Sequence, residues 1–440
     1  MKYTIQEDIG AHFLDKVVQE VKDGKTFSFV IDNIDWEEHV YEMRSDNQNQ
    51  SVHAVATSIV FDRVSSSHLP DEEPQQSLAS CDVVKLVQLS DSDIAIQKRV
   101  YKSIAAHILC EYIPTFKFLK DLVTHFDVPM QHKVEMQQKS LVVPFPVLFK
   151  DEKRYAEIVD VLDQLEKWVH HIYALAGKIP PEKDISNAHH VTLPSLPSTS
   201  QPDQPLSHVH PVADPNDPLA KVRVPCYSDQ LTRVRIAGAK DLRAGCHTAK
   251  DQISHIYPIK CADWHCKRSF LKLIFKKLYK NSGRAAGTLR FFREKLQRRN
   301  VTRDVKHFEE CEQLFLSVGR AYTVAAFLQF FGMSALDDSP SHNIPPYDVV
   351  QGNGDQKLYF DTILDKFVEE YLMQTTHDAD CDEEPDDQQP DRIRQYSICL
   401  LRFFFILEDF KRAVRIGDGD RLASLRKHKL TRQGGLPLQP

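Results

Sequence analysis

The chain has 440 residues, which is enough for two or three domains or for one core with large insertions. Its 42% hydrophobic and 27% charged residues are typical of a soluble globular protein, and its net charge of −6 does not by itself indicate a polyanionic partner. The nine cysteines include no C-x-x-C pair, which favours a reducing, intracellular compartment over a disulfide framework. Acidic residues near the N-terminus argue against a secretory signal. The apolar runs are shorter than the roughly 20 residues of a membrane span, so no membrane partner is expected.

Residues 1–64 predict the first part of an α/β core. Apolar residues spaced four apart predict a helix over 9–21, and the β-branched and aromatic run 26–31 predicts a strand that ends at Asp32. A second strand is expected over 52–61, antiparallel to the first across a polar turn. These patterns predict a hairpin that carries an acidic residue on its first strand.

Residues 65–185 predict a mostly helical insertion. Helical patterns appear around 95–126 and 153–176, and the proline-containing stretch 142–148 predicts one extended segment between them. Residues 186–219 are rich in Pro, Ser and His, a composition that cannot bury enough apolar surface to fold alone. We therefore expect a flexible linker there.

Residues 220–335 predict the second part of the α/β core. Strand-like runs over 220–227 and 253–261 lead to Asp229 and Asp263, and each run is followed by a helix. Two strand-to-helix units in succession predict a parallel pair within a mixed sheet. Further along we expect helices over 287–297, 308–331 and 393–415, a C-terminal helical region over 336–426 with an acidic loop over 378–391, and a disordered tail over 427–440.

Three aspartates, Asp32, Asp229 and Asp263, follow predicted strands. Strand ends are where α/β proteins place their ligands, and two Mg²⁺ ions that act on a phosphodiester need carboxylates held by a rigid sheet. The pattern predicts a site in which Asp32 and Asp229 bind Mg²⁺ or Mn²⁺. Asp263 would be the third catalytic acid and His265 a supporting group. The alternative is structural, because Asp is common where a strand ends or a helix is capped.

The segment 267–306 is strongly basic, with only Glu294 and Asp304 as acidic residues. It directly follows Asp263, and such a segment is suited to a phosphate backbone, which predicts DNA as the partner. A basic solvated face without a ligand is the alternative. The residues expected to contact nucleic acid are Lys267, Arg268, Lys272, Lys276, Lys277, Lys280, Arg290, Arg293, Arg298 and Arg299.

Zinc is a second metal hypothesis. Thiolate and imidazole ligands suit Zn²⁺, but the spacing of Cys246, His247, Cys261, His265 and Cys266 matches no compact zinc finger. The adjacent histidines His170 and His171 are expected at the surface. The chain contains neither a G-x-G-x-x-G nor a P-loop sequence, which argues against a nucleotide-driven enzyme.

Short motifs along the chain resemble those of one family, domain-of-unknown-function family 6589. The likeness is expected to run from about Phe27 to Arg421, and it implies relics of DNA transposons with an RNase H-like mixed sheet, flanking helices and a large helical insertion. The motifs that carry it are Asp32-Asn33-Ile34-Asp35-Trp36, Ser228-Asp229-Gln230-Leu231-Thr232, Asp263-Trp264-His265, Gly287-Thr288-Leu289 and Gly417-Asp418-Gly419-Asp420-Arg421.

The chain departs from that family in two places. Ser228 stands where the resemblance implies a glycine, and residues 427–440 look unrelated to the longer ending expected after the Gly-Asp-Gly motif. A truncated C-terminus is therefore expected. If the third acid belongs to the missing part, the protein would bind DNA without cutting it.

Two functions follow from these patterns. The first is transposase-like, metal-dependent cleavage and transfer of DNA strands, with a nuclear location inferred from DNA as the substrate. The second is a non-catalytic nucleic-acid-binding or protein-interaction module domesticated from a transposon. The enzyme requires Asp32 and Asp229 side by side on neighbouring strands, whereas the binding module does not.

Overall fold

A computed structural model describes residues 13–44, 48–66, 80–82, 88–180, 217–280, 283, 285–373 and 392–433. The chain forms two compact units. Unit 1 comprises Met1–Glu73 and Gln138–Ala262, and unit 2 comprises Pro74–Gln137 and Asp263–Pro440. Most of the predicted linker and the whole predicted acidic loop lie outside the described residues.

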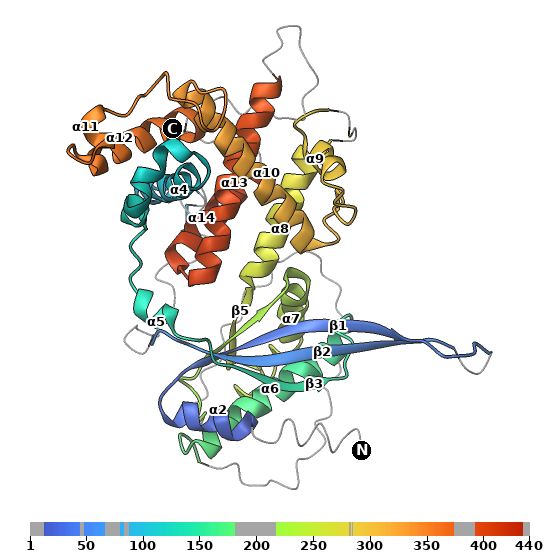
Figure 1. Ribbon diagram of the computed structural model, residues 1–440. Helices are drawn as coiled ribbons and strands as arrows, with labels where there is room; N and C mark the ends of the chain where they lie inside the picture. The colour runs from blue at the N-terminus through green and yellow to red at the C-terminus, as the bar shows by residue number, and fades with distance from the viewer. Residues whose placement is uncertain are drawn as a thin grey trace. The chain divides into compact units, whose positions relative to one another are not determined.

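The described part of unit 1 contains a five-stranded mixed sheet in the order β3-β2-β1-β4-β5 (Figure 1). Strand β2 is antiparallel to both of its neighbours, β1 and β3, whereas β4 runs parallel to β1 and β5 runs parallel to β4. The strands are β1 (Phe27–Glu38), β2 (Gln50–Phe61), β3 (Val142–Leu148), β4 (Val224–Ser228) and β5 (Ile256–Cys261). The predicted hairpin and the predicted parallel pair both belong to this sheet.

Strand β1 is longer than its sequence pattern predicts. It was expected to end at Asp32, but it continues to Glu38, so Asp32 lies inside the strand. The reason is that β2 pairs with β1 over its whole length, from Phe27 opposite Phe61 to Glu38 opposite Gln50. A paired partner strand keeps the polar second half of β1 extended, although that half buries little apolar surface.

Strand β3 is the edge of the sheet next to β2. It contains Pro144 and Pro146, which cannot donate a backbone hydrogen bond and therefore fit an edge strand. This segment was expected as one extended stretch within a helical insertion. Residues 74–137 of that insertion lie in unit 2, whereas β3 and the helix after it belong to the α/β unit.

Three helices of unit 1 share one hydrophobic core with the sheet: α2 (Phe13–Lys22), α6 (Tyr155–Leu175) and α7 (Gln230–Leu242). Helix α6 carries buried residues at 158, 162, 165, 169 and 172, which is the spacing of one helical face. Figure 1 shows α2 and α6 beside the sheet. Full burial of each large apolar side chain stabilises the fold by about 1.5–3 kcal/mol relative to exposure.

The described part of unit 2 is helical, and its long helix α13 packs against α4, α8, α10 and α14. Phe403, Phe404 and Phe405 of α13 are all buried in this core. Its elements are α4 (Asp91–Tyr112), the 3-10 segment η2 (Pro114–Phe126), α5 (Lys133–Gln137), α8 (Asp263–Leu278), α9 (Leu289–Lys295), α10 (Phe308–Phe331), α11 (Tyr347–Val350), α12 (Gln356–Val368), the π-helical turn η3 (Glu369–Met373), α13 (Arg392–Ile416) and α14 (Gly419–Gln433).

Helix α10 has the limits that its sequence pattern predicts. It is long and apolar enough to cross a membrane by length and composition alone, yet 56% of its most apolar window is buried inside the protein. A buried core helix of a soluble domain satisfies the same test, so α10 is weak evidence for a membrane segment.

The C-terminal region differs from the expected disordered tail. Helix α14 begins after Gly417, which has the positive φ of 71° that favours glycine, and continues to Gln433. Leu422 and Leu425 are buried in the core of unit 2, and Lys427 contacts Asp93 of α4 at 2.8 Å. These tertiary contacts extend the helix into a sequence that is too polar to predict it. Residues 434–440 lie outside the described residues.

Candidate functional site

Asp32 and Asp229 lie at corresponding positions of two neighbouring parallel strands. The last pair between β1 and β4 joins Val30 and Tyr227, and each aspartate stands two residues further along its chain. Neighbouring strands are about 4.8 Å apart, so this register brings the two aspartates to one edge of the parallel sheet. The side chain of Asp32 is exposed, and that of Asp229 is half-buried.

Asp229 also has a structural role, because it is the N-cap of α7. Its Oδ1 accepts a hydrogen bond from the backbone N–H of Thr232 at 2.6 Å. Asp32 accepts a hydrogen bond from the backbone N–H of Asn33 at 3.0 Å. Asp229 therefore caps a helix, as the structural alternative predicts.

A third carboxyl group, that of Glu152, lies near both aspartates. Glu152 precedes α6 and is only 5% exposed. Its Oε2 accepts a hydrogen bond from Thr232 Oγ1 at 2.6 Å, and its Oε1 accepts one from Arg235 Nη1 at 2.6 Å. Burial raises the pKa of Glu152, and the negative charges of Asp229 and Asp32 raise it further, against the lowering effect of Thr232 and Arg235.

Sequence reasoning missed Glu152. It stands in the charged run 150–154, where no periodicity or spacing separates it from its neighbours. Only the packing of α6 beside α7 brings it to Thr232 and Arg235. No signal in the sequence would have found this residue.

Asp35, which stands three residues after Asp32 on β1, contacts two side chains, His53 and Lys153. Its Oδ1 lies 2.6 Å from His53 Nδ1, and its Oδ2 lies 3.3 Å from Lys153 Nζ. The hydrogen bond to His53, followed by the contact with Lys153, keeps the pKa of Asp35 below its ordinary value. These contacts place Asp35 in a surface ion-pair network.

Asp263 and His265 belong to unit 2, at the start of α8. The carboxylate of Asp263 forms an ion pair with Arg426 of α14. The ring of His265 meets the ring of Trp264 edge-on, with the ring centres 4.8 Å apart. Within unit 2, therefore, Asp263 joins α8 to α14.

The basic segment divides into structural and exposed residues. Lys267 pairs with Glu312 at 3.0 Å, and Arg293 donates to the backbone oxygens of Val301 and Arg299 at 3.0 and 3.1 Å. Arg268 lies over the ring of Trp264, with its guanidinium carbon 5.6 Å from the ring centre. Arg290 and Lys277 are half-buried. The exposed residues among those predicted to bind DNA are Lys272, Lys276, Lys280, Arg298 and Arg299.

Metal-binding geometry singles out a group that differs from both sequence predictions. In the described parts of the chain, the set of His, Cys, Asp or Glu ligand atoms that all lie within 4.8 Å of one another belongs to Glu166, His170 and His255. The predicted cysteine and histidine set is not such a group, nor are the three carboxyl groups around Asp32. A pair of Mg²⁺ ions about 4 Å apart spreads its outer ligands up to about 8 Å, so a two-metal site does not require that closeness.

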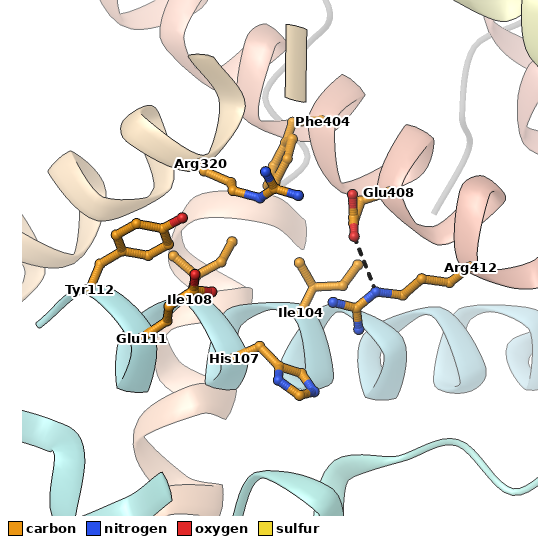
Figure 2. A pocket seen from close by; sticks show the side chains of 9 residues that line it. All are labelled: Ile104, His107, Ile108, Glu111, Tyr112, Arg320, Phe404, Glu408 and Arg412. Atoms are coloured by element: carbon orange, nitrogen blue, oxygen red, sulfur yellow. Dashed lines mark hydrogen bonds and ion pairs between the residues drawn. The ribbon is translucent and has the colours of Figure 1, made fainter. Parts of the chain in front are cut away.

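A cavity of about 280 Å³ lies inside unit 2 among α4, α10 and α13 (Figure 2). Two acidic and two basic side chains line it, and Arg412 Nε contacts Glu408 Oε1 at 3.3 Å. Burial lowers the pKa of His107 at its wall, and the charge of Arg412 lowers it further. Its charges are balanced, which favours no particular charged ligand. The lining residues are Ile104, His107, Ile108, Glu111, Tyr112, Arg320, Phe404, Glu408 and Arg412.

The five-stranded sheet and its flanking helices define a mixed α/β protein, in which Asp32 and Asp229 follow the last parallel pair of β1 and β4. Residues 76–432 match the family described as Family of unknown function (DUF6589), and the chain belongs to that family. Asp229, Asp263 and Glu152 lie inside the matched range, whereas Asp32 lies before it. Comparisons with curated proteins and with solved structures found no match.

Proposed function

We propose that the chain is a transposon-derived protein with an RNase H-like core that cleaves and transfers DNA strands in a metal-dependent reaction. The strand order β3-β2-β1-β4-β5 supports this core, because RNase H-like sheets have three antiparallel strands followed by two parallel ones in this order. Within unit 1, the helices α6 and α7 follow β3 and β4 along the chain, as such a core requires.

The register of Asp32 and Asp229 is the observation that carries the proposal. Asp32 on β1 and Asp229 directly after β4 give two carboxylates at one edge of a rigid sheet, and their oxygens are the ligands that Mg²⁺ and Mn²⁺ prefer. Metal ions held there would stabilise the charge on the attacking and leaving oxygens of a phosphodiester. The chain's own contribution is to hold the two carboxylates in place, Asp229 through its bond to the Thr232 amide.

The exposed basic residues of unit 2 supply the DNA-binding part of the proposal. Lys272 and Lys276 are four residues apart on α8, so they share one helical face, and Arg298 and Arg299 follow α9. Lysine and arginine that neutralise phosphates bind DNA without regard to sequence and with strong salt dependence. These basic residues would determine the affinity for DNA and not the choice of target sequence.

Conversion of supercoiled plasmid to its nicked form tests the proposal. The wild-type chain, Asp32→Asn, Asp229→Asn and the exposed control Asp241→Asn would be assayed with Mg²⁺, Mn²⁺ or chelator. We expect metal-dependent nicking by the wild type and by Asp241→Asn, and a loss of at least about 100-fold in the other two variants. Equal nicking by all four proteins would overturn the assignment of the acids.

A non-catalytic DNA-binding module is the second candidate, and one observation favours it. Both oxygens of Glu152 are already engaged, one by Thr232 and one by Arg235, so the third carboxyl group near the aspartates serves packing. The same experiment separates the candidates. Salt-sensitive DNA binding without nicking at any metal concentration would support the binding module.

A further inference from the structure

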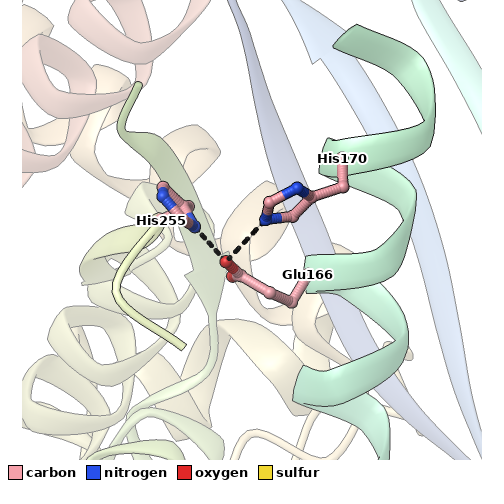
Figure 3. Close-up of side chains that lie close together, drawn as sticks. All are labelled: Glu166, His170 and His255. Atoms are coloured by element: carbon pink, nitrogen blue, oxygen red, sulfur yellow. Dashed lines mark hydrogen bonds and ion pairs between the residues drawn. The ribbon is translucent and has the colours of Figure 1, made fainter. Parts of the chain in front are cut away.

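A second group of polar side chains is buried in unit 1, away from the strand ends that carry the aspartates. Glu166 and His170 lie four residues apart on one face of α6, and His255 immediately precedes β5 (Figure 3). One ligand atom from each residue lies within 4.8 Å of the other two. The residues Glu166 and His255 are 1% and 0% exposed, and the side chain of His170 is 12% exposed. His170, which we expected at the surface, is therefore largely buried.

His255 contacts a carboxyl group through each of its ring nitrogens. Nδ1 contacts Glu166 Oε1, and Nε2 lies 2.9 Å from Asp217 Oδ2. Histidines that bind a metal through one nitrogen usually place the other nitrogen against a carboxylate, which fixes the tautomer and the ring orientation. Asp217 stands in that position. His255 thus has a candidate ligand atom on one side and an orienting group on the other.

Glu166 supplies a second, independent observation. Its Oε2 is fully buried and has no hydrogen-bond partner among the described residues. A buried carboxylate oxygen without a partner is unfavourable in an apolar surrounding, so native proteins rarely leave one unpaired. A cation bound between the side chains would satisfy this oxygen.

We propose that Glu166, His170 and His255 bind a zinc ion, with Asp217 orienting His255. Two imidazole nitrogens and one carboxylate are a ligand set that suits Zn²⁺ and not Mg²⁺, which requires oxygen ligands. His170 Nε2 lies 3.9 Å from Glu166 Oε1, and ligand atoms of a tetrahedral zinc ion lie about 3.4 Å apart. Glu166 Oε2 or a water molecule would complete the coordination.

The position of the site indicates a structural role. The backbone oxygen of His255 accepts a hydrogen bond from Val224 N at 2.7 Å, at the amino-terminal ends of β4 and β5. The aspartates lie just beyond the last parallel pair of β1 and β4, towards the opposite ends of these strands. Zinc there would join α6 to the start of β5 and, through Asp217, to the segment that leads into β4.

A metal-free ion pair is the competing explanation. In that case protonated His255, together with the nearby ammonium group of Lys240, neutralises Glu166. Lys240 donates to the backbone oxygen of Ile256 at 2.9 Å, so it is held beside this group. The two explanations differ in whether the protein retains a metal ion.

Metal content tests the proposal without DNA or an activity assay, so its outcome is independent of the proposed function. The full chain would be stripped with a chelator, reloaded with Zn²⁺ or Co²⁺, and assayed for bound metal by mass spectrometry and for the ligand-field absorption of Co²⁺. We expect one ion per chain in the wild type and its loss in His170→Ala and His255→Ala. Asp217→Asn should bind about 10- to 100-fold more weakly.

His171→Ala is the matched control, because His171 is the next residue on α6 and is exposed. It should bind as the wild type does. Circular dichroism would identify variants that fail to fold. Of the three proposed ligands, His170 has the least buried side chain, so His170→Ala is expected to disturb folding least. No retained metal in the wild type, or unchanged binding in folded His170→Ala, would overturn the zinc site and support the ion pair.

Discussion

Asp32 and Asp229 stand at the same level on neighbouring parallel strands, each two residues beyond the pair formed by Val30 and Tyr227. The two positions are 197 residues apart in the chain. Because Asp229 also caps α7, its hydrogen bond to the helix and its proposed role as a metal ligand can be tested separately.

Substitutions of Asp229 should separate these contributions. Asparagine caps a helix about as well as aspartate, whereas alanine cannot. We expect Asp229→Ala to lower the free energy of unfolding by about 1 kcal/mol and Asp229→Asn by only a few tenths, although both remove the proposed metal ligand. Urea unfolding measures the difference. Equal destabilisation by both variants would contradict a simple capping role.

Removal of the Glu152 side chain should destabilise unit 1. Glu152→Ala leaves Thr232 and Arg235 without their buried partner, for which we expect a loss of about 2–4 kcal/mol. Thermal and urea unfolding of the variant check this, with the exposed Glu38→Ala as a control. A change below about 0.5 kcal/mol would show that water replaces the carboxylate without cost.

Asp93 should make stability depend on acid pH. Burial alone would raise its pKa, but hydrogen bonds from Lys427 and Ser90 outweigh burial and lower the pKa to about 2 from the ordinary 3.8. A lowered pKa means that the stabilisation is complete above about pH 4 and is lost as the pH falls towards 2. With allowance for solvent screening, Asp93→Asn should cost about 1–2 kcal/mol at pH 7.

Urea unfolding of wild type and Asp93→Asn at a series of pH values measures that dependence. The difference between the two proteins should shrink as the pH falls below about 4 and be largely lost once the pH falls below about 2. Asp91→Asn changes an exposed acid in the same helical turn and should show no comparable pH dependence. A constant difference from pH 7 to pH 2 would contradict the lowered pKa of Asp93.

Gly319 should not tolerate a side chain. It lies on α10 where that helix meets α13, and a Cβ there would lie 2.7 Å from the Cβ of Phe404 and overlap its ring. Overpacking of this kind costs about 1–3 kcal/mol, so Gly319→Ala should lower the melting temperature despite its gain in helix propensity. Ala325→Gly on the exposed face of α10 provides a comparison, since it should cost about 1 kcal/mol through propensity alone.

The exposed lysines of α8 should control the salt dependence of DNA binding. If both contact phosphate, Lys272→Ala with Lys276→Ala should reduce the slope of log affinity against log salt by about two. Lys267→Ala on the same helix is the matched control, because Lys267 pairs with Glu312 and should affect stability more than the slope. Fluorescence anisotropy over a salt series measures both. An unchanged slope in the double variant would exclude this face from the DNA interface.

Local patterns predicted most elements of the fold. The spacing of apolar residues was sufficient for α10, whose limits match the prediction, and for α6, whose core face repeats every three or four residues. The spacing of apolar residues did not predict polar segments that are stabilised by a neighbouring strand or helix. The second half of β1 is extended because β2 pairs with it, and α14 continues because Lys427 and two leucines meet other helices.

Local patterns were enough to identify residues that could carry charge chemistry, because Asp32, Asp229 and the basic segment stand beside recognisable elements. Which of these residues meet depends on the tertiary fold. It brought Glu152 to Asp229 and Asp32, gave Asp263 an ion pair with Arg426, and gathered Glu166, His170 and His255. The physical reason is the separation along the chain over which each kind of interaction acts. Periodicity and capping act over one or two turns of chain, whereas strand register and helix packing join residues that are far apart in sequence.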